Sequence, residues 1–303
     1  TNEYAPARLK ATLVMTMFCG FPLGSTIGGI ISAPLIAHYG WQSVFVLGGV
    51  LPLILLPVLY ILLPESARFL ALRGDAGNRL PRILAKIDPT VSVEQFMKEI
   101  GQESAAAPAS RFPLVELFTA GRAKLTLLVW MAFFMNLLVM YFLVNWLPSL
   151  LHSLGLPLET AILSTALLNL GGVCGAIILG RVIDRYEPAF ILGLAYAGSA
   201  VFIALIALAG PNITLLLAGA ALAGFGIVGG QIALNAVAAS SYPTAIRSTG
   251  VGWALGVGRV GSILGPVAGG ALLGLGWSSR DLILVAVIPS LLAALVVFFL
   301  PKR

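Results

Sequence analysis

One arginine lies deep inside a long apolar run near the end of the sequence. Arg259 is the twelfth residue of the run 248–275, where its neighbours are glycines and aliphatic side chains. A cation at the centre of a membrane helix costs about 2.5–3.5 kcal/mol on insertion scales, so it needs a partner or a water-filled cavity. A guanidinium can hold a carboxylate through two parallel hydrogen bonds. We therefore expect Arg259 to contact an anionic substrate or a coupling acid, with a purely structural ion pair as the alternative.

Six further polar side chains lie inside apolar runs and are candidates for substrate binding. They are Asn136, Tyr141, Asn145, Asn169, Gln231 and Asn235. Tyr141 and Asn145 are four residues apart, so they share one helix face. The same spacing joins Gln231 to Asn235. Asn136 lies about half a turn away from Asn145, so both can face one site only on a kinked helix.

Amides and a phenol can bind an aromatic acid by hydrogen bonds and by ring stacking. The same groups also join helices inside membrane bundles, because polar side chains rarely face lipid. Both roles remain open for all six residues.

A short charged motif lies between the apolar runs 159–180 and 189–210. It contains Gly180, Asp184 and Arg185. We expect Asp184 to pair with Arg247 or to cap the first helix near Thr12, where the helix dipole favours an anion. Such a contact would act as a gate that holds one side of the protein closed, and a solvated loop is the alternative.

The elements that carry these residues are too apolar for a water-soluble fold. Of the 303 residues, 59% are hydrophobic and 10% are charged, whereas soluble domains carry about 25% charged residues. A helix needs about 20 apolar residues to cross a lipid bilayer. Eight runs reach this length, which predicts an all-α membrane protein. The runs are 9–37, 42–63, 124–150, 159–180, 189–210, 213–239, 248–275 and 281–300.

Lys and Arg residues are distributed unevenly between the two sides of the predicted bundle. Sixteen of the eighteen fall on one side when the connections alternate. Cytoplasmic loops are enriched in these residues. We therefore expect a multi-pass protein of the plasma (inner) membrane, with residues 65–122 and the C-terminus in the cytoplasm. The net charge of +6 is then a topology signal, and no nucleic-acid partner is expected.

Glycines recur every four residues in two distant runs. Each series forms a flat helix face that a second helix can approach closely. The offset from Gly20 to Gly261 is 241 residues and is the same for every member, which predicts two parallel halves related by duplication. The N-terminal glycine series is Gly20, Gly24 and Gly28, and the C-terminal glycine series is Gly261, Gly265 and Gly269.

These motifs resemble those of the major facilitator superfamily. The pattern Gly-x-x-x-Asp-Arg is present at 180–185, and Pro-Glu-Ser-x-Arg is present at 64–68. In the second motif, Glu65 and Arg68 are either gating residues or a local clasp. The resemblance implies the major facilitator fold of twelve helices in two halves, of which this chain would supply the equivalents of helices 5–12. Four further helices are then expected before the first residue.

Four stretches are more similar to the aromatic acid:proton symporter family. They are 3–8, 18–24, 133–148 and 256–261, the last of which contains Arg259. The resemblance implies that residues 1–64 end an N-terminal six-helix bundle, residues 65–122 form a cytoplasmic loop, and residues 123–303 form the C-terminal bundle.

The function implied by this resemblance is secondary active transport. The specific expectation is proton-coupled uptake of a small organic acid, most specifically an aromatic one, by alternating access. The expected partners are the organic anion, protons and the bilayer, with a monomeric full-length protein. A sugar or other metabolite porter, or a non-transporting membrane sensor or scaffold, is the alternative. The sequence has no ATP-binding loop, catalytic motif or metal-ligand cluster, so we expect no enzyme activity, cofactor or metal.

Overall fold

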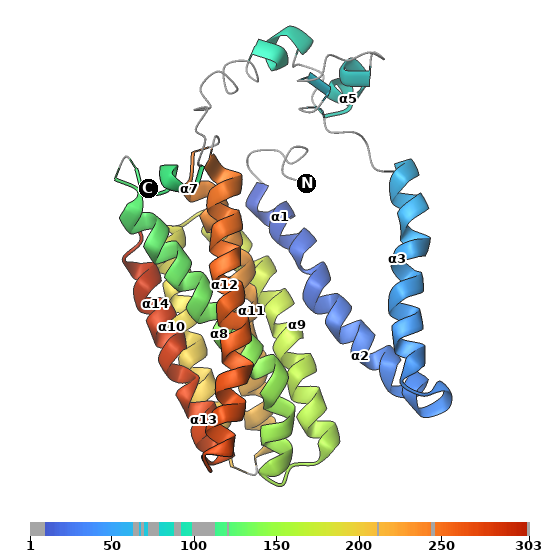
Figure 1. Cartoon of the computed structure of the whole chain (residues 1–303), viewed down its shortest axis with the longest axis vertical. Coiled ribbons are helices and arrows are strands. Elements are labelled where there is room, and N and C mark those ends of the chain that lie inside the picture. The colour runs from blue at the N-terminus through green and yellow to red at the C-terminus, as the bar shows by residue number, and fades with distance from the viewer. Residues whose placement is uncertain are drawn as a thin grey trace. The chain divides into compact units, whose positions relative to one another are not determined.

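The structure is a computed structural model of the chain. It describes residues 10–62, 67, 70–71, 79–87, 92–98, 113–119, 121–210, 212–243 and 246–301. Throughout these residues the regular elements are helices (Figure 1). Glu65 and Arg68 lie outside the described residues.

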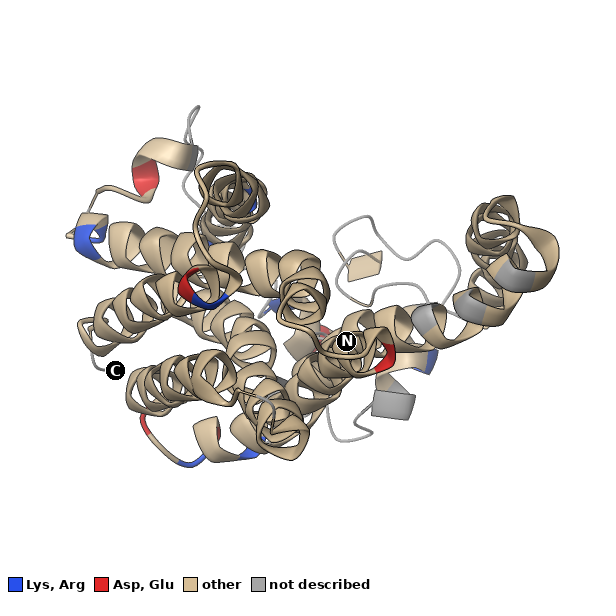
Figure 2. Ribbon diagram, turned by 90° about the horizontal axis from the view of Figure 1, so that it is seen from below, with Lys and Arg blue, Asp and Glu red and all other residues tan. Residues whose placement is uncertain are grey.

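Eight helical stretches among the described residues are long and apolar enough to cross a membrane. They confirm the predicted all-α fold of a multi-pass membrane protein, and each predicted run ends within three residues of the observed span. The spans are Thr12–Ile36, Gln42–Leu62, Ala123–Ser153, Leu158–Ile183, Pro188–Leu208, Ile213–Ser241, Arg247–Gly274 and Ser279–Phe298. Figure 2 shows that most of the described ribbon carries neither acidic nor basic residues.

The first and the last span are each divided into two helices. In both, the first helix ends at a residue four positions before a proline, which has no N–H to donate to that residue's carbonyl. Phe18 precedes Pro22 in this way, and Val285 precedes Pro289. The sequence-based prediction of uninterrupted runs misses both breaks. The four helices are α1 (Lys10–Phe18), α2 (Gly20–Tyr39), α13 (Ser279–Val285) and α14 (Val287–Phe298).

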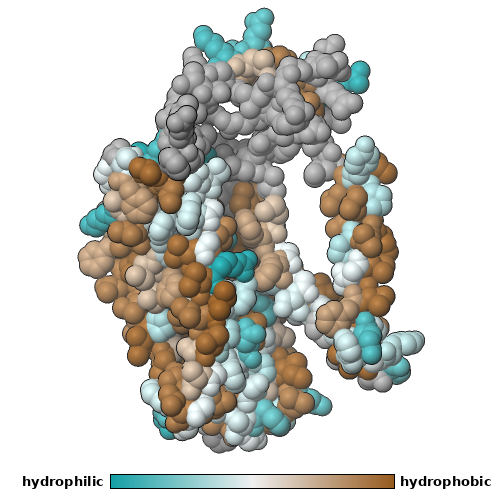
Figure 3. Space-filling model, viewed as in Figure 1, coloured by the Kyte–Doolittle hydropathy of each residue, from teal (hydrophilic) through white to brown (hydrophobic). Residues whose placement is uncertain are grey.

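The chain divides into two compact units. Residues 7–23 and 109–303 form the larger unit, in which the last six spans surround one continuous apolar core. Its remaining helices are α7 (Pro113–Glu116), α8 (Ala123–Ser153), α9 (Leu158–Ile183), α10 (Pro188–Leu208), α11 (Ile213–Ser241) and α12 (Arg247–Gly274). Figure 1 shows the helices α8 to α14 packed side by side, from green to red. Figure 3 shows apolar side chains over much of the visible face of these helices.

Glycines bring two pairs of helices in the larger unit into backbone contact. In the α9–α11 pair, a Cβ atom on Gly175 would meet the backbone of Phe225, and one on Gly224 would meet the backbone of Leu168. In the α8–α12 pair, a Cβ atom on Gly261 would meet the carbonyl oxygen of Phe134. Any side chain at these three positions would force the paired helices apart.

The two glycine series differ in their surroundings. In the C-terminal glycine series, Gly265 faces the backbone of Leu138, and Gly269 faces the side chains of Phe142 and Trp146. In the N-terminal glycine series, an added Cβ atom would meet no described atom within 4 Å.

The smaller unit consists of residues 1–6 and 24–108. Its spanning helix α3 (Gln42–Leu62) is apolar along its length, and none of its residues is buried among the described residues. The short helix α5 (Arg79–Ile87) is amphipathic. Its Leu80 and Leu84 are buried in a small apolar cluster with Ala67.

Candidate functional site

Arg259 and Tyr141, predicted from separate apolar runs, meet across the α8–α12 contact. The Nη1 atom of Arg259 donates a hydrogen bond of 2.8 Å to the Tyr141 hydroxyl. The guanidinium carbon lies 6.0 Å from the centroid of the same ring. Gly258 and Gly261 flank the arginine and pack directly against α8, so the absence of two side chains allows the arginine to reach the tyrosine.

Three amides form a second polar group between α8 and α11. The Nδ2 atom of Asn136 donates to Gln231 Oε1 at 2.8 Å and to the carbonyl oxygen of Ile227 at 3.1 Å. The Nε2 atom of Gln231 then donates to Asn235 Oδ1 at 3.3 Å. Asn136 is fully buried, Gln231 is 8% exposed and Asn235 is half-buried. We refer to Asn136, Gln231 and Asn235 as the amide row.

Members of both polar groups line one cavity of about 230 Å³ inside the larger unit. Four of its residues are polar or charged: Tyr141, Arg259, Gln231 and Asn235. The others are apolar, including two phenylalanines from the break between α1 and α2. They are Phe18, Phe21, Pro22, Leu137, Met140, Val228, Ile232 and Leu255. A few convergent polar groups on an apolar wall are typical of small-molecule binding sites.

Three of the predicted binding residues do not line this cavity. Asn136 lies behind it and bonds Gln231. Asn145 is exposed, and its Nδ2 atom donates to the carbonyl of Tyr141 at 2.7 Å. Asn169 is 4% exposed, and its Nδ2 atom donates to the carbonyl of Thr165 at 3.0 Å. Each of these last two amides therefore bonds the carbonyl four residues earlier on its own helix, and its role in substrate binding stays a prediction.

The charged motif contacts the first helix of the chain. Asp184 accepts a hydrogen bond of 2.8 Å from the Thr12 hydroxyl, which is the contact expected near the start of that helix. It is made through the threonine side chain and not through a backbone N–H. Gly180 leaves room for α1, since a Cβ atom on it would lie 3.2 Å from Met15 Sδ. Arg185 is exposed.

Arg247 was the other expected partner of Asp184, and it donates a hydrogen bond to a backbone carbonyl. Its Nε atom donates to the carbonyl of Tyr242 at 3.4 Å. This bond holds the start of α12 to the end of α11.

Sequence reasoning missed the apolar walls of the cavity and one link between helices. Phe18 and Phe21 carry no reactive group, and the sequence marks them only as members of the stretch 18–24. Trp146 donates through its indole Nε1 to the carbonyl of Pro266 at 2.9 Å. This bond joins α8 to α12.

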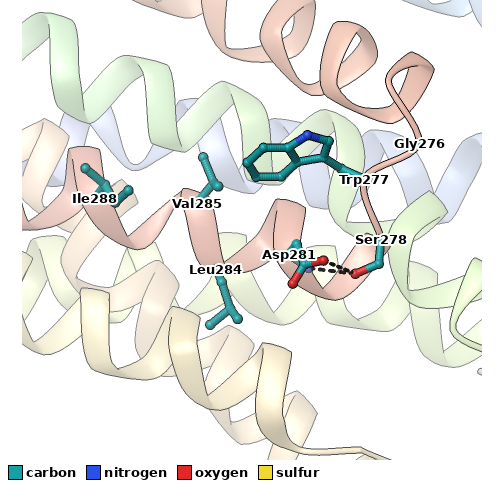
Figure 4. A pocket seen from close by; sticks show the side chains of 7 residues that line it. All are labelled: Gly276, Trp277, Ser278, Asp281, Leu284, Val285 and Ile288. Atoms are coloured by element: carbon teal, nitrogen blue, oxygen red, sulfur yellow. Dashed lines mark hydrogen bonds between the residues drawn. The ribbon is translucent and has the colours of Figure 1, made fainter.

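A second hollow, of about 640 Å³, lies where α12 is followed by α13 (Figure 4). Its one carboxylate belongs to Asp281, which accepts a 2.6 Å hydrogen bond from the Ser278 hydroxyl. The same hydroxyl accepts from the Asp281 backbone N–H at 3.2 Å. This reciprocal pairing is a helix cap, so the carboxylate stabilises the start of α13 and is already partnered.

Comparison with known proteins decides the family. The sequence profile of the Major Facilitator Superfamily matches residues 1–211 and 129–303. The chain belongs to the major facilitator superfamily. The predicted superfamily resemblance is thereby confirmed.

Two transporters of Pseudomonas putida are similar to the chain over nearly all its length. The 4-hydroxybenzoate transporter PcaK of Pseudomonas putida is 42% identical over 292 residues, which cover 96% of this chain and 65% of that protein. A gallate transporter of Pseudomonas putida is also 42% identical, over 97% of this chain and 65% of that protein. The chain thus spans slightly less than two thirds of the length of these relatives.

A solved structure of the superfamily supports the fold. The proton:xylose symporter XylE matches with a TM-score of 0.74 at 20% identity, covering 99% of this chain and 66% of that one. At this identity the match establishes the major facilitator fold alone.

Proposed function

We propose that the protein is a secondary transporter that carries small aromatic carboxylates across the membrane together with protons. The observation that carries the proposal is the pairing of Arg259 with Tyr141 on the wall of a small apolar cavity. The names of similar proteins, transporters of 4-hydroxybenzoate and of gallate, agree with it.

The chemistry of the cavity suits a carboxylate attached to one ring. A guanidinium has several N–H donors in one plane, and the bond to Tyr141 uses one of them. The remaining donors can hold a carboxylate through paired, charge-assisted bonds, which are about twice as strong as neutral ones. The apolar wall can pack against the ring, and Phe18 and Phe21 can stack on it. A volume of about 230 Å³ lies below the roughly 300–1,000 Å³ of pockets for drug-sized ligands.

The transport cycle that we propose is alternating access around this cavity. In this superfamily, transport proceeds by rocking of two helix bundles about a central site. The bond between Asp184 and Thr12 would then hold one side closed and break when that side opens. We assign residues 1–64 to the first bundle, 65–122 to a cytoplasmic loop in the inner membrane protein, and 123–303 to the second bundle.

Uptake measurements test the proposal. The protein, expressed from its native gene in cells without such a transporter, should take up labelled 4-hydroxybenzoate in a saturable way. A protonophore should abolish this uptake, and excess xylose should leave it unchanged. Arg259→Lys should lower uptake roughly tenfold or more, because an ammonium cannot reproduce the planar pairing of a guanidinium.

The matched control is Arg280→Lys, which makes the same change at an exposed residue outside the cavity and should transport normally. Full activity of Arg259→Lys, or uptake of xylose without uptake of any aromatic acid, would overturn the proposal.

A further inference from the structure

The direction of the amide row is fixed by one backbone carbonyl. A carbonyl oxygen only accepts hydrogen bonds, so Ile227 requires Asn136 to point its Nδ2 atom toward it. The same Nδ2 atom donates to Gln231, which must therefore present its oxygen. The Nε2 atom of Gln231 is then left to donate to Asn235. Amide orientations follow from such networks, and here each one follows from the one before it.

The row ends in the cavity with an unused donor. Asn235 offers its oxygen to Gln231, so its Nδ2 atom is turned away from the row. Among the described residues no hydrogen bond uses this Nδ2 atom. Asn235 is half-buried and lines the cavity. An oxygen of a ligand in the cavity can accept a hydrogen bond from this donor.

This donor and the arginine come from different helices and from different bonded groups. Arg259 lies on α12 and bonds Tyr141, whereas Asn235 lies on α11 at the end of the amide row. Both side chains line the cavity. The cavity therefore carries two sets of donors, one charged and one neutral.

We propose that Asn235 is a specificity-determining residue that donates a hydrogen bond to an oxygen substituent on the aromatic ring. Gln231 and Asn136 are positioning residues that hold its amide in the donating orientation. The inference rests on the proposed function, in which Arg259 holds the carboxylate. It assigns hydroxy-substituted aromatic acids as the preferred substrates over unsubstituted ones.

The arrangement predicts a preference that depends on the polarity of the substituent. A site built to bond a substrate oxygen discriminates strongly against an analogue that lacks it, because its own polar group is left unpaired. The 4-hydroxyl oxygen accepts a hydrogen bond, whereas the amino group of 4-aminobenzoate mainly donates. We expect 4-hydroxybenzoate to compete for uptake at least about tenfold better than benzoate or 4-aminobenzoate.

The test compares these three acids as competitors of labelled uptake in each variant. A ratio between two acids in one variant does not depend on how much protein reaches the membrane. Asn235→Leu should reduce the preference for 4-hydroxybenzoate over benzoate to less than about threefold, because the donor is lost.

A positioning variant and a control complete the experiment. Asn136→Ala should lower the preference ratio, because it releases the orientation of Gln231. Ser199→Ala removes a different bond onto α11, from the Ser199 hydroxyl to the carbonyl of Ala223, at a residue that does not line the cavity. Its ratio should equal that of the unaltered protein.

Three results would separate the possibilities. If Asn235→Leu keeps the full preference, or weakens benzoate and 4-hydroxybenzoate equally, the amide row only joins helices and the inference is wrong. The proposed function would survive either result, because aromatic acids would still be carried. If the unaltered protein takes up none of the three acids, the proposed function itself fails.

Discussion

Two helix pairs of the larger unit pack through glycines, but the two contacts have different consequences. In the α9–α11 pair, glycines on both helices face the partner's backbone, as Gly175 and Gly224 do. In the α8–α12 pair the glycines lie on α12 alone. Gly261 and Gly265 face the backbone of α8, whereas Gly258 and Gly269 face its side chains. The first arrangement brings two backbones together and leaves little else between them. The second leaves room beside the contact, and Arg259 and Tyr141 occupy it.

The largest effect should come from filling the α9–α11 contact. Gly224→Val would place a side chain in the backbone of Leu168, so we expect a loss of stability of about 1–3 kcal/mol or more from overpacking. Thermal unfolding of the purified protein in detergent measures this. Gly256→Val, on α12 where an added Cβ meets no described atom within 4 Å, is the control. Equal melting temperatures for the two variants would contradict the close contact.

A smaller change in the α8–α12 contact should affect both stability and binding. Gly261→Ala would push α12 away from the carbonyl of Phe134, and with it Arg259 away from Tyr141. We expect the KM for an aromatic acid to rise several-fold at a modest cost in stability. Uptake kinetics together with a melting curve would resolve the two effects. A fall in stability with an unchanged KM would mean that the contact does not position the arginine.

Removing one hydroxyl group tests the polar side of the same contact. Tyr141→Phe deletes the acceptor of the Arg259 bond but keeps the ring. Hydrogen bonds to charged groups contribute about 1.5–3 kcal/mol, so we expect the apparent affinity for an aromatic acid to fall about tenfold. Competition binding measures it, with Tyr186→Phe, at an exposed tyrosine outside the cavity, as the control. An unchanged affinity would show that Arg259 needs no support from the phenol.

The smallest effect should follow from loss of the hydrogen bond between Trp146 and the Pro266 carbonyl. Trp146→Phe removes the bond to the Pro266 carbonyl and keeps an aromatic ring against Gly269. A neutral hydrogen bond contributes about 0.5–1.5 kcal/mol, so the melting temperature should fall slightly. The preference among aromatic acids should not change. A changed preference would extend the binding site to this end of α8.

The sequence was sufficient for the spans and for part of the site. Length and hydropathy were sufficient to predict all eight spans. A segment that crosses lipid must satisfy its own backbone hydrogen bonds, and a long apolar segment does so as a helix. The side chains of Arg259 and Tyr141 were recognisable, because polar groups inside apolar runs need a partner. Their meeting depends on which helices pack together, and glycine spacing indicates a close contact without naming the partner helix.

The hydrogen-bond partners of asparagines and the effect of prolines on a helix could not be predicted from residue type alone. Asn145 and Asn169 bond carbonyls of their own helices, whereas Asn136 reaches across to Gln231, although all three are asparagines in apolar runs. Prolines are similarly ambiguous. Pro22 and Pro289 accompany breaks, while Pro148 and Pro266 lie inside continuous helices.

The break between α1 and α2 has a consequence for the wall of the cavity. Phe18 and Phe21 lie on either side of Cys19, where the helix is interrupted, and both line the cavity with Pro22. Proline carries no amide hydrogen, so Pro22 cannot donate to the Phe18 carbonyl, whereas Cys19 keeps backbone bonds to Met15 and Leu23. The aromatic side of the cavity is thus carried by an interrupted but still hydrogen-bonded segment, while α8 and α12 are held together by glycine contacts. A substrate ring would lie between a surface shaped by a proline and a surface shaped by glycines.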